Sequence, residues 1–310
     1  MPDARPAAAA DAVVERLRPL LGEPEGDPVP LDGGITNRNL RLRAGGEDYV
    51  VRLPGKRTDV LGIDRAAERA ATEMAAAAGA APAVAAFLAD EGVLVTHFVA
   101  GEPVTPERLR EPATLIEVAA RLRAVHAGPG LQSAFSPFRI VEAYLDSAAG
   151  RGASIPPDQA PAAALAAEIE PLMAGPEHAP VPCHNDLLAA NFIADGERLW
   201  IVDWEYAGMG DRYFDLANLS INSGFDETDD ERLLEAYFEQ PSTAARFACL
   251  RLMRLMSDYR EAMWGVVQTV VSELDFDFAG YAAEHFARLR ATADDPRYPE
   301  WVRDARAAAA

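Results

Sequence analysis

The chain has few cysteines, a single lysine and no long uninterrupted hydrophobic segment. Among its 310 residues only Cys183 and Cys249 carry thiols, which is too few for a disulfide framework. No apolar run approaches the roughly 20 residues that a membrane-spanning helix needs. The N-terminus lacks a basic region followed by an apolar one, so it does not resemble a signal peptide. We therefore expect a cytoplasmic protein that does not insert into a membrane.

Basic residues are also scarce relative to acidic ones. The sequence holds 29 lysines and arginines against 49 aspartates and glutamates, which gives a formal net charge of −20. This excess disfavours nucleic acids and anionic membrane surfaces as partners. It is compatible with a cationic small molecule, although solubility alone explains most acidic surfaces. Hydrophobic residues make up 49% of the chain, so a sizeable core can form in one large domain or two.

Two short apolar segments, 191–193 and 199–202, flank an Asp-Gly turn in the middle of the chain. This pattern predicts a β-hairpin. A hairpin brings its open ends together, so Asn191 and Asp203 should converge, with Asp186 close by on the preceding loop. Amide and carboxylate oxygens at one point suit Mg²⁺, which keeps several waters and binds substrate phosphates in addition.

The same residues follow the spacing of a kinase catalytic site. HNDL at 184–187 and Asn191 match the protein-kinase pattern H-R-D-L-x-x-x-N, and Asp203 stands where D-F-G begins. Phosphoryl transfer needs a group that orients the attacking hydroxyl, and metal-held phosphates in line with it. Asp186 suits the first role, while Asn191 and Asp203 suit the second. The alternative is a hairpin with a polar turn and a core histidine.

The segments CHNDLLAANF, VDWEYAG and FDLAN resemble the choline/ethanolamine kinase family, within the aminoglycoside-phosphotransferase-like group. The similarity extends from about residue 33 to about residue 286. It implies an α+β, protein-kinase-like fold with a small β-sheet lobe carrying one helix and a larger, mainly helical lobe. We place the nucleotide-binding lobe at 1–98, with 1–10 disordered, and the helical lobe at 99–310. The resemblance also implies ATP and Mg²⁺ as cofactors, with His184 and Asp215 supporting the catalytic loop.

Two features argue against a protein kinase. Only eleven residues separate Asp203 from Asp215, which leaves little room for an activation segment, and no APE follows. In addition, Trp204 and Glu205 replace the Phe-Gly of the kinase metal motif. The acceptor is therefore expected to be a small molecule.

Nucleotide binding is assigned to the small lobe. The glycines before the first predicted strands allow backbone N–H groups to approach phosphate oxygens, although a plain hairpin turn has the same pattern. Arg52 lies within a predicted strand, where the resembled family has a phosphate-binding arginine, so it is also counted as catalytic. Glu68 would pair with it from the next helix, unless Arg65 or Arg69 competes. The full set is Gly33, Gly34, Thr36, Asn37, Arg52, Glu68 and Phe98.

The resemblance places acceptor binding on residues that follow the metal motif and on the C-terminal helices. Aromatic rings there would attract an ammonium group by cation–π contact, although packing in the core is the alternative. The set is Trp204, Glu205, Tyr206, Glu261, Trp264, Phe276 and Tyr281. Glu261 stands where animal choline kinases have an aromatic residue, and a carboxylate can bind a primary ammonium.

Choline is accordingly the first expected acceptor. Ethanolamine, thiamine and aminoglycosides are alternatives within the same fold, and a non-catalytic nucleotide-binding pseudokinase is the alternative from another class. The sequence leaves open the choice between ATP and GTP, and whether the protein forms a homodimer.

Overall fold

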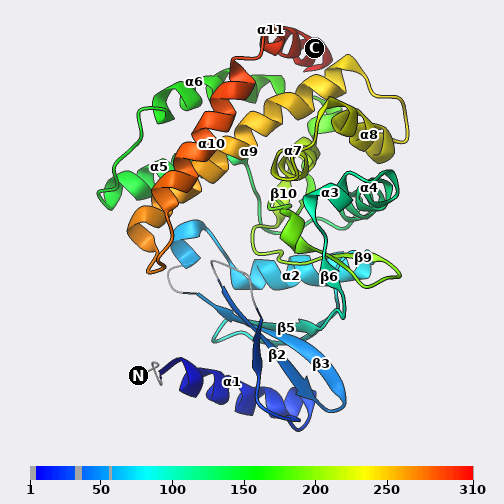
Figure 1. The fold of residues 1–310 in the computed structure, drawn as a ribbon, viewed down its shortest axis with the longest axis vertical. Coiled ribbons are helices and arrows are strands. Elements are labelled where there is room, and N and C mark those ends of the chain that lie inside the picture. The colour runs from blue at the N-terminus through cyan, green and yellow to red at the C-terminus, as the bar shows by residue number, and fades with distance from the viewer. Residues whose placement is uncertain (1–4, 32–36, 56–57, 310) are drawn as a thin grey trace.

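The computed structural model describes residues 5–31, 37–55 and 58–309. Its N-terminal part is an antiparallel sheet in the order β1-β2-β3-β5-β4, shown at the bottom of Figure 1. The strands are β1 (Val29–Leu31), β2 (Asn37–Ala44), β3 (Glu47–Pro54), β4 (Val84–Leu88) and β5 (Val93–His97). The hairpin between β2 and β3 pairs Asn39 with Arg52, which fixes the position of Arg52 in the sheet.

Alternation along the strands places apolar side chains on one face of the sheet, where a helix covers them. Leu40 and Leu42 of β2 pack with Val51 of β3 and with Leu17 of helix α1 (Arg5–Leu21). Side chains two residues apart on a strand point to the same face, which is why these residues meet. Helix α1 is an addition to the single helix expected in this lobe.

Helix α2 (Arg65–Ala77) lies between the sheet and the helical part of the molecule (Figure 1). The Asp64 side chain caps its N-terminus by accepting hydrogen bonds from the backbone N–H groups of Ala66 and Ala67. Alanine favours the helical conformation, which accounts for a helix over this alanine-rich segment. Glu68 is in the first turn and buried, which directs it toward the interior.

The C-terminal part is mainly helical and is organised around α9 (Ala244–Val271), which α5, α7, α10 and α11 surround. Because it is covered on all sides, α9 is buried along most of its length, including its charged residues. The other helices are α3 (Pro106–Leu109), α4 (Pro112–His126), α5 (Pro137–Gly150), α6 (Gln159–Ile169), α7 (Arg212–Asn222), α8 (Glu227–Phe238), α10 (Phe278–Ala293) and α11 (Tyr298–Ala309). Among the described residues, no helix is long and apolar enough to cross a membrane.

Short strands join the two parts near the predicted catalytic segment. One small sheet has the order β6-β8-β9, from β6 (Glu102–Pro103), β8 (Phe192–Ala194) and β9 (Leu199–Ile201). A second pairs β7 (Val181–Cys183) with β10 (Gly208–Gly210). Single 3-10 turns lie at Thr58–Leu61, Glu170–Leu172, Pro176–His178 and Ala189–Asn191. The boundary predicted between residues 98 and 99 stays a prediction; β5 ends at His97 and β6 begins at Glu102.

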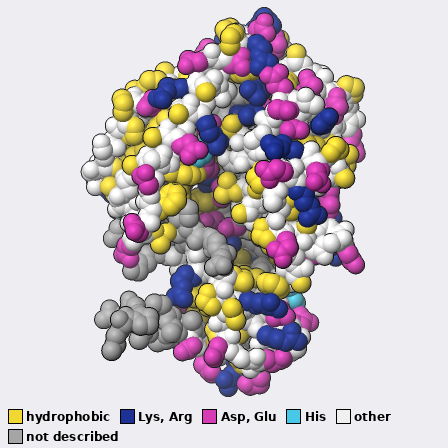
Figure 2. Space-filling model, viewed as in Figure 1, with side chains coloured by type: hydrophobic (Ala, Val, Ile, Leu, Met, Phe, Trp, Pro, Cys, Tyr) yellow, Lys and Arg dark blue, Asp and Glu magenta, His cyan; other side chains and the backbone are white. Residues whose placement is uncertain are grey.

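Acidic and basic side chains are interspersed over both parts on the face shown in Figure 2. Between the sheet and the helical part this face is hollowed.

Candidate active site

The predicted β-hairpin is present, and it brings the three oxygen-bearing residues together. Strands β8 and β9 pair Phe192 with Ile201. Beyond that pair, the backbone N–H of Val202 donates to the Asn191 carbonyl at 2.9 Å. The Asn191 side-chain amide in turn donates to the backbone carbonyl of Asp186 at 2.8 Å. Asn191 is thus held between the loop of Asp186 and the start of the Asp203 turn.

Asp203 has a backbone conformation that non-glycine residues adopt rarely, with φ of 70°. The ring of Trp204 holds the next position, because its indole N–H donates to the Ile201 carbonyl at 3.0 Å and the ring packs edge-on against His184. Such strain at a site is maintained only by surrounding contacts. The left-handed turn therefore directs the Asp203 carboxylate away from the core and toward the interface with the sheet.

His184 is a supporting residue in this geometry. Its Nε2 donates to the Val202 carbonyl at 2.9 Å, and its Nδ1 accepts from the backbone N–H of Asp186 at 3.2 Å. Burial lowers the pKa of His184, so the neutral imidazole is the favoured form. A neutral ring can donate from one nitrogen and accept at the other, which is what this position uses.

Asp215, on α7, binds the backbone of the loop that carries Asp186. Its carboxylate accepts from the backbone N–H groups of His184 at 2.8 Å and Asn185 at 2.6 Å. His126 of α4 contacts the same carboxylate at 3.0 Å through Nε2. One turn later Asn218 accepts from the backbone N–H of Leu187 at 2.5 Å. The segment FDLAN thus accepts hydrogen bonds from three of the four backbone N–H groups of residues 184–187, and the fourth, that of Asp186, donates to the His184 ring.

Arg52 connects the sheet to the catalytic segment. Its Nη1 lies 2.7 Å from a Glu68 oxygen and 2.6 Å from an Asp203 oxygen. The predicted pairing of Arg52 with Glu68 is therefore present, and Arg65 shares Glu68 at 2.7 Å rather than displacing Arg52. Although burial opposes its charged form, the Asp203 and Glu68 carboxylates raise the pKa of Arg52. The guanidinium is a fixed positive charge at this position.

A second connection between the two parts passes through Glu205. Its carboxylate accepts from the Asn37 side chain at 2.8 Å and from Arg65 at 3.1 Å. Burial and the nearby Asp203 charge raise the pKa of Glu205 to about 7. Glu205 and Asn37 thus join the lobes here, although the sequence assigned Glu205 to the acceptor and Asn37 to the nucleotide.

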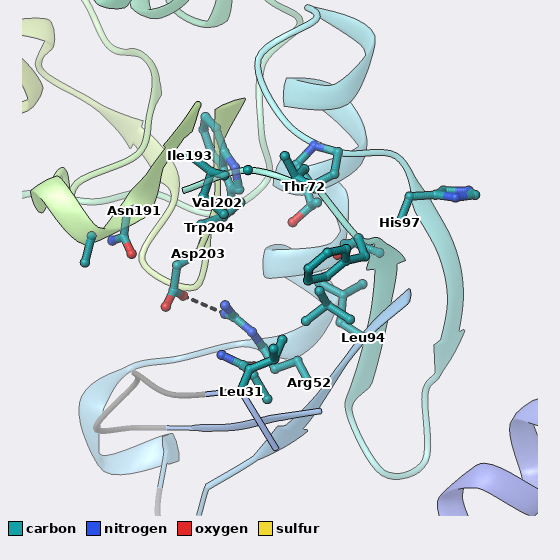
Figure 3. A pocket seen from close by; sticks show the side chains of 18 of the residues that line it. Leu31, Arg52, Thr72, Leu94, His97, Asn191, Ile193, Val202, Asp203 and Trp204 are labelled. Carbon is teal, nitrogen blue, oxygen red and sulfur yellow. Dashed lines mark hydrogen bonds and ion pairs between the residues drawn. The ribbon is translucent and has the colours of Figure 1, made fainter. Parts of the chain in front are cut away.

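A cavity of about 370 Å³ lies between the sheet and the hairpin, and Figure 3 shows it from close by. Its walls come from β3, β5, the segment that follows β5, and the hairpin. Arg52, Asn191 and Asp203 stand at its polar end (Figure 3). The lining also includes Leu31, Val50, Glu68, Leu94, His97, Phe98, Val99, Ile193, Val202 and Trp204. An apolar slot with a charged end is typical of a site for a flat ring that carries an anionic group.

Two of the predicted acceptor residues, Glu261 of α9 and Tyr281 of α10, are linked to Asp186 through Arg260, which the sequence had not singled out. Arg260 of α9 donates to the Asp186 carboxylate at 3.0 Å and also to Glu261. Tyr281 of α10 donates to the other Glu261 oxygen at 2.8 Å. Burial raises the pKa of Asp186 to about 7 against the lowering effect of Arg260, and the carboxylates of Glu261, Asp203 and Glu205 add to the rise.

The predicted aromatic residues lie in different surroundings. Trp264 packs edge-on against Tyr281 and Phe278, with ring centroids 5.6 and 5.8 Å apart. Tyr206 lies under the Arg260 guanidinium. Phe276 is 48% exposed at the end of the loop before α10 and packs on Phe278. Trp204, which the sequence assigned to the acceptor, lines the cavity between the sheet and the hairpin.

Three predicted residues, Gly33, Gly34 and Thr36, lie outside the described residues. The predicted Phe98 lines the cavity. Sequence reasoning missed Arg260 and the Arg65–Glu205 contact. The available signal for Arg260 was a run of charged residues within an otherwise apolar helix, where burial requires each charge to have a partner.

The oxygen donors at the polar end of the cavity fit a hard divalent cation. The Asn191 amide nitrogen is used by the Asp186 carbonyl, so its oxygen is the atom left for a ligand. In Figure 3 this oxygen and the Asp203 carboxylate lie toward each other at the cavity edge. Two such oxygens, together with waters and phosphate, are a usual ligand set for Mg²⁺.

Comparison with known proteins agrees with this architecture. Residues 27–253 match the family model described as the phosphotransferase enzyme family. The crystal structure of a choline/ethanolamine kinase family protein from Mesorhizobium loti is 30% identical and has a TM-score of 0.82, covering 96% of this chain and 99% of that one. Ethanolamine kinase 2 of Mus musculus is 28% identical over 307 residues, covering 88% of this chain and 78% of that protein.

The choline kinase LicA from Streptococcus pneumoniae shares the fold, with a TM-score of 0.78 at 24% identity over 92% of this chain and 98% of that one. The predicted α+β kinase-like fold is thus confirmed. The chain belongs to the phosphotransferase enzyme family and, within it, to the choline/ethanolamine kinase family.

Proposed function

We propose that this kinase transfers the γ-phosphoryl group of ATP to the hydroxyl of a small amino alcohol, with choline and ethanolamine as the acceptors to be compared. The observation that carries the proposal is the convergence of Asp186, Asn191 and Asp203 beside a cavity that ends in Arg52. These are the parts that phosphoryl transfer requires: an orienting carboxylate, metal ligands and a fixed cation for phosphate.

The nucleotide would occupy the 370 Å³ cavity. Its adenine would lie against the apolar walls near Phe98, and its phosphates would extend toward Arg52. The planar guanidinium donates in a fork that matches phosphate oxygens, and Glu68 keeps it in place. Asp203 lies 2.6 Å from the same guanidinium, so its carboxylate and the phosphates would share Arg52.

Asn191 and Asp203 would hold Mg²⁺. Held there, the cation would neutralise charge on the phosphates and favour alignment of the γ-phosphoryl group. Asp186 would accept the proton of the acceptor hydroxyl as the oxygen attacks, with Arg260 fixing the orientation of its carboxylate at 3.0 Å. His184 and Asp215 act on the loop that carries Asp186 and touch neither reactant.

The acceptor side supports a cationic alcohol. Asp186 and Glu261 place two carboxylates next to each other, and Tyr206, Trp264 and Tyr281 supply rings nearby. Carboxylates attract an ammonium group, and rings add cation–π attraction of about 0.5–2 kcal/mol each. An acceptor that combines one ammonium and one hydroxyl over a short distance matches this arrangement.

The test is a coupled assay for ADP release with purified protein, ATP and Mg²⁺. Choline, ethanolamine, thiamine and an aminoglycoside are supplied separately. We expect acceptor-dependent ADP release with at least one of the two amino alcohols, and its loss when EDTA removes the metal. ADP release that is independent of every acceptor, or that responds only to thiamine or the aminoglycoside, would contradict the proposal.

A further inference from the structure

The acceptor side already contains a cation that belongs to the protein. The guanidinium of Arg260 is 2% exposed and donates to Asp186 at 3.0 Å and to Glu261. Its central carbon lies 4.4 Å from the centroid of the Tyr206 ring, which is cation–π geometry. Arg260 therefore occupies one face of the Tyr206 ring and one oxygen each of Asp186 and Glu261.

This occupancy matters for the kind of ammonium that can bind. A quaternary ammonium has no N–H, so it is held mainly by aromatic faces. Here Arg260 covers one face of Tyr206, and Trp264 packs against Tyr281 and Phe278. A primary ammonium is held by hydrogen bonds, for which it needs oxygen acceptors rather than open ring faces.

Unpaired oxygens are present at this position. The hydroxyls of Tyr144 and Tyr206 are buried and have no hydrogen-bond partner among the residues that the structure describes. Nε and Nη2 of Arg260 are buried and unpartnered in the same sense. Buried polar groups are normally hydrogen-bonded, so these atoms require water or a ligand with both N–H and oxygen atoms.

The charges agree with a monocation. When both carboxyl groups are ionised, Asp186 and Glu261 contribute two negative charges and Arg260 one positive charge, which leaves one negative charge to balance. Burial raises the pKa of Tyr144 to about 12 against the lowering effect of Arg260, and the carboxylates of Glu261 and Asp186 add to the rise. The neutral phenol therefore remains able to accept a hydrogen bond from an ammonium.

We propose that Arg260 determines acceptor specificity. By covering the Tyr206 ring and holding Asp186 and Glu261, it makes the pocket a hydrogen-bonding site for a primary ammonium alcohol rather than an aromatic site for a quaternary one. The inference rests on the proposed function, because it concerns which amino alcohol that reaction uses. Arg260 contacts Asp186 as a positioning residue and is expected to contact the acceptor through its free N–H groups.

The test compares kcat/KM for ethanolamine and for choline in the wild-type protein and in Arg260→Met, at saturating ATP. Pockets built to hydrogen-bond a substrate reject analogues that lack the polar group, so we expect the wild type to favour ethanolamine by about tenfold or more. Removing the guanidinium exposes the Tyr206 ring and should lower this ratio by about tenfold, with a gain in relative rate for choline. Arg260→Lys keeps the cation and should keep most of the preference.

Arg254→Met is the matched control. Arg254 is another buried arginine of α9, but it pairs with Asp230 at 2.7 Å, away from the acceptor residues. This variant should lose stability without changing the ratio of the two acceptors. Tyr206→Phe provides a second test that does not depend on Arg260→Met folding, because it keeps the ring and removes only the hydroxyl. It should lower kcat/KM for ethanolamine about fivefold and leave that for choline nearly unchanged.

A wild-type preference for choline would overturn the inference. So would an Arg260→Met ratio equal to that of the wild type, or an equal loss of both activities, since these outcomes would make Arg260 purely structural or purely catalytic. If the wild type phosphorylates neither amine, the proposed function itself fails, and that result is seen without any variant.

Discussion

The guanidinium of Arg52 lies 2.6 Å from the carboxylate of Asp203, although 151 residues separate them in the chain. One residue comes from the middle of the sheet and the other from the turn after the catalytic hairpin (Figure 3). This contact joins the two parts of the molecule at the polar end of the cavity, where phosphate is expected to bind. The contact also fixes the positions of both side chains.

Replacing Arg52 by methionine should weaken nucleotide use. The substitution keeps the apolar stem and removes the fixed cation, so kcat/KM for ATP should fall about 100-fold, as when a preorganised donor is lost. Steady-state kinetics with varied ATP measures the change. Arg43→Met is the control, since Arg43 is an exposed arginine on the adjacent strand that pairs with Asp48. Equal effects of the two substitutions would show that Arg52 has no particular role.

Glu68→Gln should destabilise the fold. Glu68 is 1% exposed and balances both Arg52 and Arg65, which keep only Asp203 and Glu205 once its charge is removed. Because breaking a buried ion pair leaves charge uncompensated, the free energy of unfolding should fall by about 2 kcal/mol. Urea denaturation measures it. Glu73→Gln removes an exposed pair with Arg69 on the same helix and should change stability by less than about 0.5 kcal/mol.

Asp215→Asn should impair both stability and turnover. The carboxylate accepts two backbone N–H groups of the catalytic loop, and hydrogen bonds to a charged acceptor contribute about 1.5–3 kcal/mol each. We expect a lower midpoint of thermal unfolding and a reduced kcat, with KM for ATP changed little because the cavity walls are intact. Asp226→Asn, at the N-cap of α8 where asparagine is equally suitable, is the control. A normal kcat in Asp215→Asn would contradict the supporting role.

Turnover should depend on the ionisation of Asp186. Its pKa of about 7 places the carboxyl in its protonated form in acid, where it cannot take a proton from the acceptor. The rate should therefore rise with pH through about 7 and level off above, whereas an ordinary aspartate would give this rise near 4. The pKa of Asp186 is higher in the folded protein than in the unfolded chain. Its contribution to the free energy of unfolding therefore falls as the pH increases from about 4 to 7. Initial rates measured between pH 5 and 8.5 at constant Mg²⁺ test whether the rate rises through about pH 7.

Much of the site could be predicted because its chemistry is local in sequence. Asn191 and Asp203 flank one hairpin, and hairpin geometry alone brings them together. Asp186 precedes that hairpin by a few residues. The pairing of Arg52 with Glu68 was implied by the resemblance to the choline/ethanolamine kinase family, and the structure contains it.

The contacts of the acceptor side could not be predicted in the same way. Arg260 reaches Asp186 across 74 residues, and this depends on how α9 packs against the helices around it rather than on any local pattern. An arginine in an amphipathic helix usually faces solvent, and only the burial of α9 on all sides makes its charges internal. The sequence likewise indicates that aromatic residues are present on the acceptor side. The orientation of their rings depends on tertiary packing and could not be predicted.

The central claim is that residues 186, 191 and 203 form one phosphoryl-transfer centre. The most direct measurement follows ³²P from γ-labelled ATP into the amino alcohol, with wild-type protein and Asp186→Ala at matched Mg²⁺, while ATP affinity is measured separately by calorimetry. The account predicts labelled phospho-alcohol with the wild type and a loss of at least about 1,000-fold in the variant, with ATP affinity retained. Label transfer by Asp186→Ala at the wild-type rate would contradict it.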